Sequence, residues 1–329
     1  MKILFIGGNG NISWWCVNEA LKSGHEVWEL NRGITKKTRR KIQDEVKCLN
    51  GDVRTKEVED IISSCYFDVV CDFICYNEQH ARAMVELFKG RCKQYIVISS
   101  ECVYKDRNSK QPLDENSEKY CVDEVGGYIG GKIRMEQFFL QEYKKNGFPV
   151  TIVRPSLTYD TILFTPIGKN DYSVIELIKQ GYPLILPGDG EKRNIPLHSR
   201  DFATAFVSLI GNKITIGEDY LITADEKITL NDMAYSIFNK LQIAPQIKYL
   251  SCEILRETQL VKDKELFAQQ IESYNYSNEK IKTIAVGWKQ TISFFDGIGQ
   301  TIDWLNEDKN HIRIDEKYMD NYIEVVKSY

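Results

Sequence analysis

Several features that would place this chain in a simple class are missing from its sequence. No apolar run approaches the roughly 20 residues that a membrane-spanning helix needs. The nine cysteines are scattered, none forms a Cys-x2-Cys pair, and an odd total fits a disulfide framework poorly. The net charge is −4, so no basic field favours nucleic acid or an anionic membrane. These absences predict a protein of the reducing cytoplasm with no membrane span, no metal site and no nucleic-acid partner.

The composition that is present is that of a globular protein. With 43% hydrophobic and 27% charged residues, the chain is not expected to be disordered. Its 329 residues are enough for one large α/β domain and a smaller lobe. The apolar run at residues 2–6 is short and leads directly into glycines, so it is predicted to be a strand and not a signal peptide.

Strand and helix patterns alternate through the first half of the chain. This order predicts an α/β fold with a doubly wound parallel sheet and right-handed crossovers. The fourth predicted strand is nearly continuous in apolar residues, as a strand covered on both faces should be. The predicted strands cover residues 2–6, 26–30, 46–49, 68–74, 95–99 and 150–153, and the predicted helices cover residues 13–23 and 128–143.

The second half is less regular, because four prolines divide it into short pieces. It contains one more predicted strand, at residues 220–223, and helices at residues 201–209 and 231–241. The acidic and basic tail from Asp308 to Lys327 is predicted to be a solvated helix. We therefore divide the chain into a sheet domain at residues 1–160 and a smaller mixed α/β lobe at 161–329, from which about 195–230 returns to the first domain.

Two groups of residues suggest a nicotinamide enzyme. Gly7-Gly8-Asn9-Gly10 lies between a predicted strand and a predicted helix, where glycine lets the backbone approach a pyrophosphate and the helix N-terminus offers free N–H groups. Far downstream, Tyr128 and Lys132 are four residues apart on a helix and therefore share a face. Taken alone, this pair would equally fit an ordinary amphipathic helix.

Further motifs complete a family pattern over nearly the whole chain. They are Gly51-Asp52-Val53, Ser99-Ser100-Glu101-Cys102-Val103-Tyr104, Arg154-Pro155-x3-Tyr159 and His198-x2-Asp201-Phe202. Together with the glycine turn and Tyr128-x3-Lys132, they resemble the extended short-chain dehydrogenase/reductase superfamily, of the NAD-dependent epimerase/dehydratase type. The resemblance implies an NAD(P)-binding Rossmann domain at residues 1–160 and a mostly substrate-binding lobe at 161–329. It also implies a homodimer through the tyrosine helix, where Phe138, Phe139 and Tyr143 fit an interface or a core equally well.

The resemblance assigns the catalytic roles. Tyr128 is the expected acid/base on a sugar hydroxyl or ketone, and Lys132 holds the nicotinamide ribose and favours the phenolate. A free phenol has a pKa of about 10, so it needs such a positive neighbour to act as a base at neutral pH. Ser100, counted back from Val103-Tyr104, is expected to hydrogen-bond the substrate oxygen.

The same resemblance places the cofactor. The pyrophosphate is expected over the turn from Gly7 through Gly10, Asn11 and Ile12, with Ser13 standing where a third glycine is usual, and Asp52-Val53 is expected at the adenine edge. An NAD enzyme usually has an acid at the end of the second strand to accept the ribose 2′-OH. Asn31-Arg32 stands there instead, and Arg32 suits a 2′-phosphate. NADP is therefore the expected cofactor and NAD the alternative, in which Arg32 only stacks on adenine or faces water.

Cys102 is the clearest departure from the dehydratases of this family, which carry an Asp-Glu pair where this chain has Glu101-Cys102. The pattern resembles GDP-fucose synthase and GDP-mannose 3,5-epimerase, where the cysteine is a base beside a 4-keto group and a Lys or His returns a proton. Lys169 lies near that partner position. A small buried cysteine is the competing interpretation. Glu101, Lys192 and Arg193 are further substrate-binding candidates, although the two cations also fit a solvated loop.

These observations predict an NAD(P)-dependent sugar-modifying enzyme. The expected substrate is a nucleotide-diphosphate sugar, and the expected reaction is epimerisation or 4-keto reduction through hydride transfer at C4, with Cys102 as a candidate base for C3/C5 epimerisation. Two alternatives stay open. One is a reductase of a non-sugar ketone, and the other is an inactive RNA-binding or regulatory member of the superfamily.

Overall fold

The chain folds into two compact units, which are described separately. The structure is a computed structural model that describes residues 1–33, 39–105, 111–167, 171–261, 267 and 273–329. The first unit contains residues Met1–Thr158, Ser199–Thr223 and Tyr276–Lys289, and the second contains Tyr159–His198, Ala224–Asn275 and Gln290–Tyr329. The predicted site residue Lys169 lies outside the described residues.

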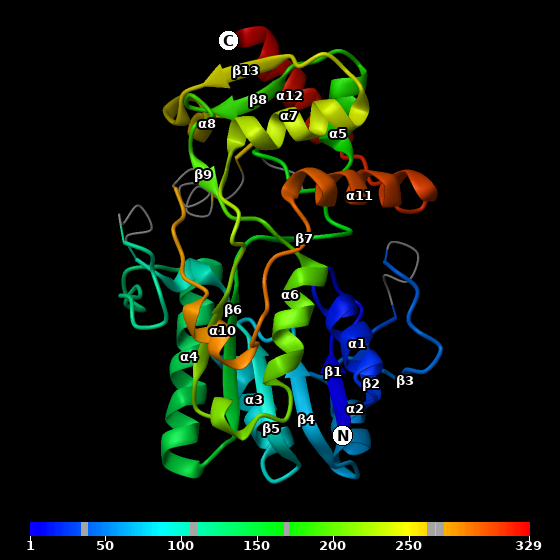
Figure 1. Cartoon of the computed structure of the whole chain (residues 1–329), viewed down its shortest axis with the longest axis vertical. Helices are drawn as coiled ribbons and strands as arrows, with labels where there is room; N and C mark the ends of the chain where they lie inside the picture. Colours follow the sequence, from blue (N-terminus) through cyan, green and yellow to red (C-terminus); the bar gives the residue numbers. More distant parts are fainter. Residues whose placement is uncertain (34–38, 106–110, 168–170, 262–266, 268–272) are drawn as a thin grey trace. The chain divides into compact units, whose positions relative to one another are not determined.

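The first unit is built on a seven-stranded sheet in the order β11-β6-β5-β4-β1-β2-β3, and every pairing is parallel. Figure 1 shows its strands lying side by side with helices around them. The strands are β1 (Lys2–Ile6), β2 (Glu26–Asn31), β3 (Lys47–Asn50), β4 (Phe67–Asp72), β5 (Cys92–Ile98), β6 (Val150–Pro155) and β11 (Asp219–Ile222).

The strand order reverses direction at β1, which pairs with β2 on one side and with β4 on the other. In an open parallel sheet, this reversal leaves a crevice at the carboxyl ends of the strands. The prediction of a doubly wound parallel sheet is confirmed. Every residue of β1 after Lys2 is fully buried, as a strand covered on both faces requires.

Helices cover both faces of this sheet. On one face, apolar side chains of α2, α3 and α4 share a core with those of β1, β4 and β5. On the other face, α1 packs against α6. The helices are α1 (Ser13–Lys22), α2 (Lys56–Ser63), α3 (Glu78–Phe88), α4 (Gly127–Asn146), α6 (Ser199–Phe206) and α10 (Glu279–Ile284), and the short 3-10 turns are Glu101–Val103, Val207–Leu209 and Lys213–Thr215.

The α4 helix carries the predicted Tyr-Lys pair and ends at Gly147, whose φ of 69° gives the left-handed cap that glycine favours. Phe138 and Phe139 are buried in the core of the first unit. Tyr143 lies against Gly217, where an added Cβ would be 2.3 Å from its ring. Of the two interpretations given for these aromatic residues, the structure places the phenylalanines in the core.

The second unit is a mixed α/β structure with its own core. Strands β8 and β13 pair in parallel, and the two-residue strands β9 and β12 pair antiparallel. Its strands and helices are β8 (Leu184–Pro187), β9 (Arg193–Asn194), β12 (Ile228–Thr229), β13 (Ile247–Leu250), α5 (Ser173–Lys179), α7 (Leu230–Leu241), α8 (Cys252–Glu257), α11 (Phe294–Glu307) and α12 (Glu316–Ser328). Two short strands, β7 (Thr158–Tyr159) and β10 (Leu197–His198), complete the description.

The C-terminal tail differs from its prediction as a solvated helix. In α12, Tyr318, Met319, Tyr322 and Val325 are buried and belong to the core of the second unit. Their spacing of one, three and four residues is that of a helix with one apolar face, which the charged residues between them obscure in the sequence. Among the described residues, no helix is long and apolar enough to cross a membrane.

Candidate active site

The glycine turn after β1 is closed by a serine hydroxyl. Gly7 has a φ of 75°, and an added Cβ there would lie 2.6 Å from Cγ2 of Ile74. The Ser13 hydroxyl accepts the N–H of Gly10 at 2.8 Å and donates to the Gly7 carbonyl at 2.6 Å. Ser13 therefore does more than fill the place of a third glycine, because its side chain fixes the shape of the turn.

A cavity of about 290 Å³ opens beside this turn in the first unit. It collects most of the predicted cofactor residues: Gly7, Gly10, Asn31, Arg32, Asp52 and Val53. Asn11 and Ile12 are not among its lining residues, and the Asn11 amide instead donates to the Thr158 carbonyl at 3.1 Å. The cavity therefore brings together the carboxyl end of β1, the carboxyl end of β2 and the segment that follows β3.

The chemistry of this cavity suits a dinucleotide. Arg32, Arg39 and Arg54 line it, and Asp52 lies within 3.8 Å of Arg32 and 3.9 Å of Arg54. The buried Oδ1 of Asn9, on the turn itself, has no hydrogen-bond partner among the described residues. Arginines complement phosphate groups, and an acid and an amide complement ribose and base. The residues present thus fit NAD(P).

Lys132 is almost completely buried beside this cavity. Its Nζ donates to the carbonyls of Cys75 and Ile98, both at 2.7 Å, just beyond β4 and at the end of β5. The ammonium group lies 4.9 Å from the ring centre of Tyr76 and 5.7 Å from that of Tyr128. Burial lowers the pKa of Lys132 from its ordinary value.

Ser100, Glu101, Cys102 and Tyr128 form a second cluster in the same unit. The Ser100 hydroxyl donates to Oε2 of Glu101 at 2.8 Å and accepts the N–H of Cys102 at 3.3 Å. The Tyr128 hydroxyl lies close enough to Cys102, Glu101 and Ser100 for all three to influence its pKa. Glu101 and Cys102 are buried, whereas Tyr128 is 43% exposed. The structure therefore brings the predicted serine and tyrosine together.

The electrostatics around Tyr128 differ from the expectation of a favoured phenolate. Burial of the hydroxyl, followed by the charges of Cys102 and Glu101, raises the pKa of Tyr128 above its ordinary value, and the Ser100 hydrogen bond opposes this only in part. In the protein alone, Tyr128 is a neutral hydrogen-bond donor at neutral pH. A bound cation would have to shift it toward ionisation.

The remaining predicted substrate residues lie elsewhere in the chain. Lys192 and Arg193 belong to the second unit, where both are exposed. The N–H of Arg193 donates to the Ser273 hydroxyl at 3.3 Å, and its carbonyl accepts from the Tyr274 N–H at 3.0 Å, so its main chain is part of the local fold.

Among the lining residues that sequence reasoning missed, Arg39, Arg54 and Tyr76 carry a charged or aromatic side chain that can contact a cofactor. A signal for Tyr76 and Arg54 was available, because each follows closely after a predicted parallel strand, and ligands bind at the carboxyl ends of such strands. Arg39 lies in the basic stretch after β2 and had no comparable signal.

The second unit has a larger cavity, of about 830 Å³, lined by side chains of α7 and the start of α11, among them Tyr235, Phe238 and Phe295. None of the predicted site residues lines it. Within the part of the chain that the structure describes, no cluster of His, Cys, Asp and Glu suits a metal ion.

Comparison with known proteins gives one family. The model for the NAD dependent epimerase/dehydratase family matches residues 3–223. The chain is 25% identical over 244 residues to the chloroplast stem-loop binding protein of 41 kDa b of Arabidopsis thaliana, covering 71% of this chain and 61% of that protein. It is 23% identical over 247 residues to dTDP-D-glucose 4,6-dehydratase of Bos taurus, covering 71% of this chain and 61% of that protein. The match therefore spans about three fifths of these curated relatives.

A solved structure extends the likeness to the whole fold. UDP-glucuronic acid 4-epimerase of Bacillus cereus, in complex with UDP-glucuronic acid and NAD, superposes with a TM-score of 0.73 at 17% identity. The superposition covers 93% of this chain and 99% of that one. At this identity, the likeness shows the shared fold alone.

A buried acid lies under the glycine turn. Glu29, on β2, is 0% exposed, and an added Cβ on Gly8 would lie 2.6 Å from its Cγ. Its Oε2 accepts from the Asn31 amide at 3.2 Å, while its Oε1 has no hydrogen-bond partner among the described residues. Burial therefore raises the pKa of Glu29 to about 7.

This acid makes the stability of the protein depend on pH. Between about pH 4.5 and about pH 7, the folded protein keeps a proton that the unfolded chain has released, so the free energy of unfolding falls as the pH rises. Glu29→Gln removes this titration. We expect the stability of Glu29→Gln relative to wild type to increase by about 2 to 3 kcal/mol between about pH 5 and about pH 8. Urea unfolding at both pH values measures it.

Glu86→Gln, on the exposed face of α3, is the matched control, and its stability relative to wild type should change little with pH. If the stabilities of wild type and Glu29→Gln changed equally with pH, Glu29 would have the same pKa in the folded and the unfolded protein.

Proposed function

We propose, because this chain belongs to the NAD-dependent epimerase/dehydratase family, that it is an NAD(P)-dependent enzyme that modifies a nucleotide-linked sugar. The observation that carries the proposal is the proximity of Tyr128 to Ser100, with Lys132 beside Tyr128, all in the unit that holds the glycine-turn cavity. A family member that had lost catalysis would have no need to keep these three side chains together.

The residues divide into two tasks. Gly7, Gly10, Asp52 and the cavity arginines would hold NAD(P), which supplies hydride exchange with a substrate carbon when bound. Tyr128 would pass its proton to or from the substrate oxygen. Ser100 would orient that oxygen, since its side chain lies near the Tyr128 hydroxyl. Lys132 would hold the cofactor ribose and add positive charge near the phenol.

The proposed reaction is epimerisation or reduction at C4 of the sugar. The dTDP-D-glucose 4,6-dehydratase among the curated relatives supports this substrate class. Within the second unit, Lys192 and Arg193 are exposed cations that would suit a diphosphate, and we keep this unit as the proposed substrate-binding lobe. Glu101, next to Ser100, would contact the sugar.

A second candidate function is RNA binding, because one curated relative is named as a stem-loop binding protein. The net charge of −4 does not favour it. RNA binding through phosphates would weaken steeply as salt increases, which distinguishes it from binding of a nucleotide sugar. A reductase of a non-sugar ketone stays a third candidate, which would bind NADPH without any nucleoside diphosphate.

The proposed setting is a reducing cytoplasm, which the nine free thiols support. We also propose a homodimer, as the resemblance implies. Since Phe138 and Phe139 are in the core, a contact through α4 would use exposed residues such as Gln137, Gln141, Tyr143 and Lys144.

The first prediction concerns the proton-transfer residue. Tyr128→Phe keeps the ring and removes the hydroxyl, so we expect turnover to fall by about 10²-fold to 10⁴-fold while NAD(P) binding is retained. The substrate for this assay is selected by denaturing wild-type protein and identifying the released small molecules by mass spectrometry. Tightly held cofactor with a nucleotide sugar indicates an epimerase cycle, and empty protein indicates a reductase with exchangeable NADPH.

Tyr66→Phe is the control, since Tyr66 is exposed just before β4 and is not among the residues that line the glycine-turn cavity. Undiminished turnover of Tyr128→Phe would contradict the assigned role. Wild-type protein that neither binds NAD(P) nor turns over any nucleotide sugar, yet retains RNA at low salt, would favour the second candidate.

The second prediction concerns Cys102, which is 3% exposed beside Ser100 and Tyr128. If its thiol removes the proton beside a 4-keto group, Cys102→Ala will lose deuterium exchange from solvent at C3 or C5 and keep hydride exchange at C4. Mass spectrometry of the sugar measures both. Cys121→Ala, at an exposed cysteine, is the control. Deuterium exchange that survives in Cys102→Ala would assign proton removal to another group and make the thiol a packing residue.

The third prediction concerns the cofactor. Arg32 is exposed over the cavity, 3.8 Å from Asp52, and we propose that it favours NADP over NAD by binding the 2′-phosphate. Arg32→Ala should weaken NADPH binding by about tenfold or more and change NADH binding little. Fluorescence titration measures both affinities, with Arg82→Ala on exposed α3 as control. An unchanged ratio of the two affinities would exclude a 2′-phosphate contact at Arg32.

A further inference from the structure

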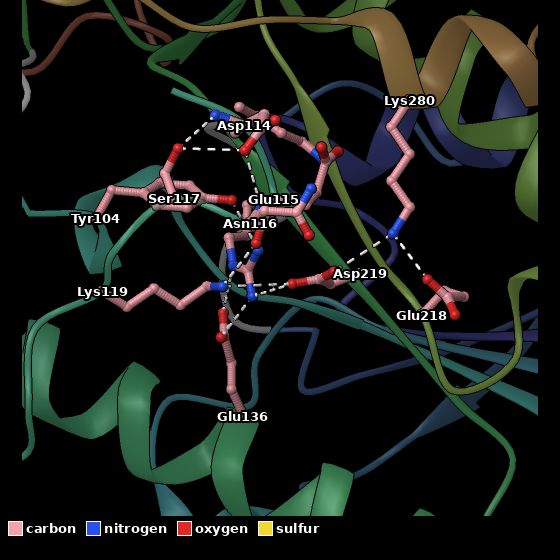
Figure 2. Close-up of polar contacts among 12 residues, drawn as sticks. Tyr104, Asp114, Glu115, Asn116, Ser117, Lys119, Glu136, Glu218, Asp219 and Lys280 are labelled. Carbon is pink, nitrogen blue, oxygen red and sulfur yellow. Dashed lines mark hydrogen bonds and ion pairs between the residues drawn. The ribbon is translucent and has the colours of Figure 1, made fainter. Parts of the chain in front are cut away.

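Arg154, on β6, is a guanidinium enclosed by protein, with a side chain that is 1% exposed. Its Nε and Nη2 donate to the two carboxylate oxygens of Glu136, each at 2.8 Å, and its Nη1 donates to the Tyr104 hydroxyl at 2.8 Å. Nη2 also lies 2.6 Å from Oδ2 of Asp219. Figure 2 shows Tyr104, Glu136 and Asp219 converging on one point between the helix and the sheet.

Two of these partners come from the two segments that carry the candidate catalytic residues. Glu136 follows Lys132 by four residues on α4, so it lies one turn further along the same face. Tyr104 directly follows the 3-10 turn Glu101–Val103, whose cap is Ser100. A single side chain on the sheet therefore connects the tyrosine helix with the serine turn.

The geometry of the contact is well defined. Two parallel N–H donors meet one carboxylate, an arrangement that fixes both the distance and the plane of the partner. Lysine would supply the charge without this fork and would not bond Glu136 and Tyr104 at once. Burial alone would lower the pKa of Arg154. The negative charge of Glu136 and the other acidic neighbours outweigh that effect and raise the pKa above its ordinary value, so the guanidinium stays charged.

A second layer of contacts holds Tyr104 in place. The main chains of Tyr104 and Lys119 form an isolated antiparallel β-bridge, and Nζ of Lys119 lies 5.4 Å from the centre of the Tyr104 ring. Nζ of Lys119 donates to the Glu115 carbonyl at 2.9 Å, and the Glu115 carboxylate accepts the Leu221 N–H on β11 at 2.7 Å. The segment after the serine turn is thus fastened to the far edge of the sheet (Figure 2).

Asp219 on β11 closes this layer. It lies 3.8 Å from Nζ of Lys119 and 3.5 Å from Nζ of Lys280, in addition to Arg154. Burial opposes its ionisation, but the charges of Arg154 and Lys119 leave the pKa of Asp219 below its ordinary value. Arg154 thus has a charged partner on its other side, and its orientation toward Glu136 and Tyr104 does not depend on either contact alone.

We propose that Arg154 is a positioning residue for the reaction. Through Glu136 and Tyr104, it sets the separation between the helix face that carries Tyr128 and Lys132 and the turn that carries Ser100. The inference rests on the proposed function and adds a residue that touches none of the reacting atoms. Proton transfer between Tyr128 and a substrate oxygen held by Ser100 depends steeply on that separation, since a misplacement of about 1 Å can lower a rate about 10²-fold.

Tyr104→Phe is the variant that tests the connection, because it removes one hydroxyl and keeps the ring and the Arg154–Glu136 pair. We expect kcat to fall about tenfold or more, with KM and NAD(P)H affinity little changed. Hydrogen exchange measured by mass spectrometry should become faster in a peptide covering residues 99–104. The midpoint of urea unfolding should fall as well, because Nη1 of Arg154 loses its buried acceptor. Arg154→Lys should reproduce the loss of kcat, because one ammonium group cannot replace the fork.

Tyr322→Phe is the matched control. Tyr322 is buried in the second unit, donates to the Pro183 carbonyl at 3.0 Å and accepts the Ile185 N–H at 2.6 Å. Its loss should lower the unfolding midpoint and leave kcat and the 99–104 exchange unchanged. A Tyr104→Phe protein that behaves in the same way would reduce Arg154 to a structural role and overturn the inference.

The two proposals fail differently. If wild-type protein turns over no substrate, the proposed function fails, and hydrogen exchange alone then decides whether Arg154 positions the serine turn. Unchanged exchange in the 99–104 peptide of Tyr104→Phe overturns the inference in either case. Faster exchange with wild-type turnover shows that the turn moves without consequence for the chemistry, which also overturns it.

Discussion

The hydrogen bonds of Lys132 to the carbonyls of Cys75 and Ile98 connect the candidate site to the sheet. A buried ammonium group is costly unless it is hydrogen-bonded, and these carbonyls follow two adjacent parallel strands whose separation the sheet fixes. The position of α4 follows from that requirement, and Tyr128, one turn before Lys132, is placed with it. An ammonium group has three hydrogens, and the hydrogen bonds of the described residues use two of them, which leaves one for a ligand.

Much of the first unit could be predicted because its sequence pattern follows its burial. The predicted ranges 2–6, 26–30 and 150–153 lie within β1, β2 and β6, where apolar residues mark the buried strands. The helices α2 and α3 were not predicted. The first is short and buries only Val58 and Ile62, whereas α3 has an Asn77 cap and five buried apolar residues, a pattern that could have been recognised. The motifs located Ser100, Tyr128 and Lys132. They could not reveal that Lys132 bonds main-chain carbonyls, because no side-chain pattern encodes the direction of a carbonyl.

Several residues whose roles the sequence did not reveal break a local rule. Glu29 is an acid in the middle of a buried strand, where the pattern gives no reason to expect ionisable chemistry. Ser13 replaces a glycine that the family resemblance led us to expect. Its hydroxyl holds the turn in shape through hydrogen bonds to Gly7 and Gly10. Arg154 and Glu136 are charges inside the core. Such exceptions to local consistency gather at functional sites, and here all of them adjoin the glycine turn or the tyrosine helix.

The hydrogen bonds around Ser100 also constrain the order of events in the site. A serine hydroxyl has one hydrogen, and that of Ser100 is donated to Glu101. The serine can therefore donate to a substrate oxygen or to Tyr128 only by leaving Glu101. A serine hydroxyl that donates to the Tyr128 oxygen stabilises the phenolate, so release of Ser100 from Glu101 and activation of Tyr128 are linked. The burial and negative neighbours that raise the pKa of Tyr128 then keep it protonated until substrate and a cationic cofactor are present.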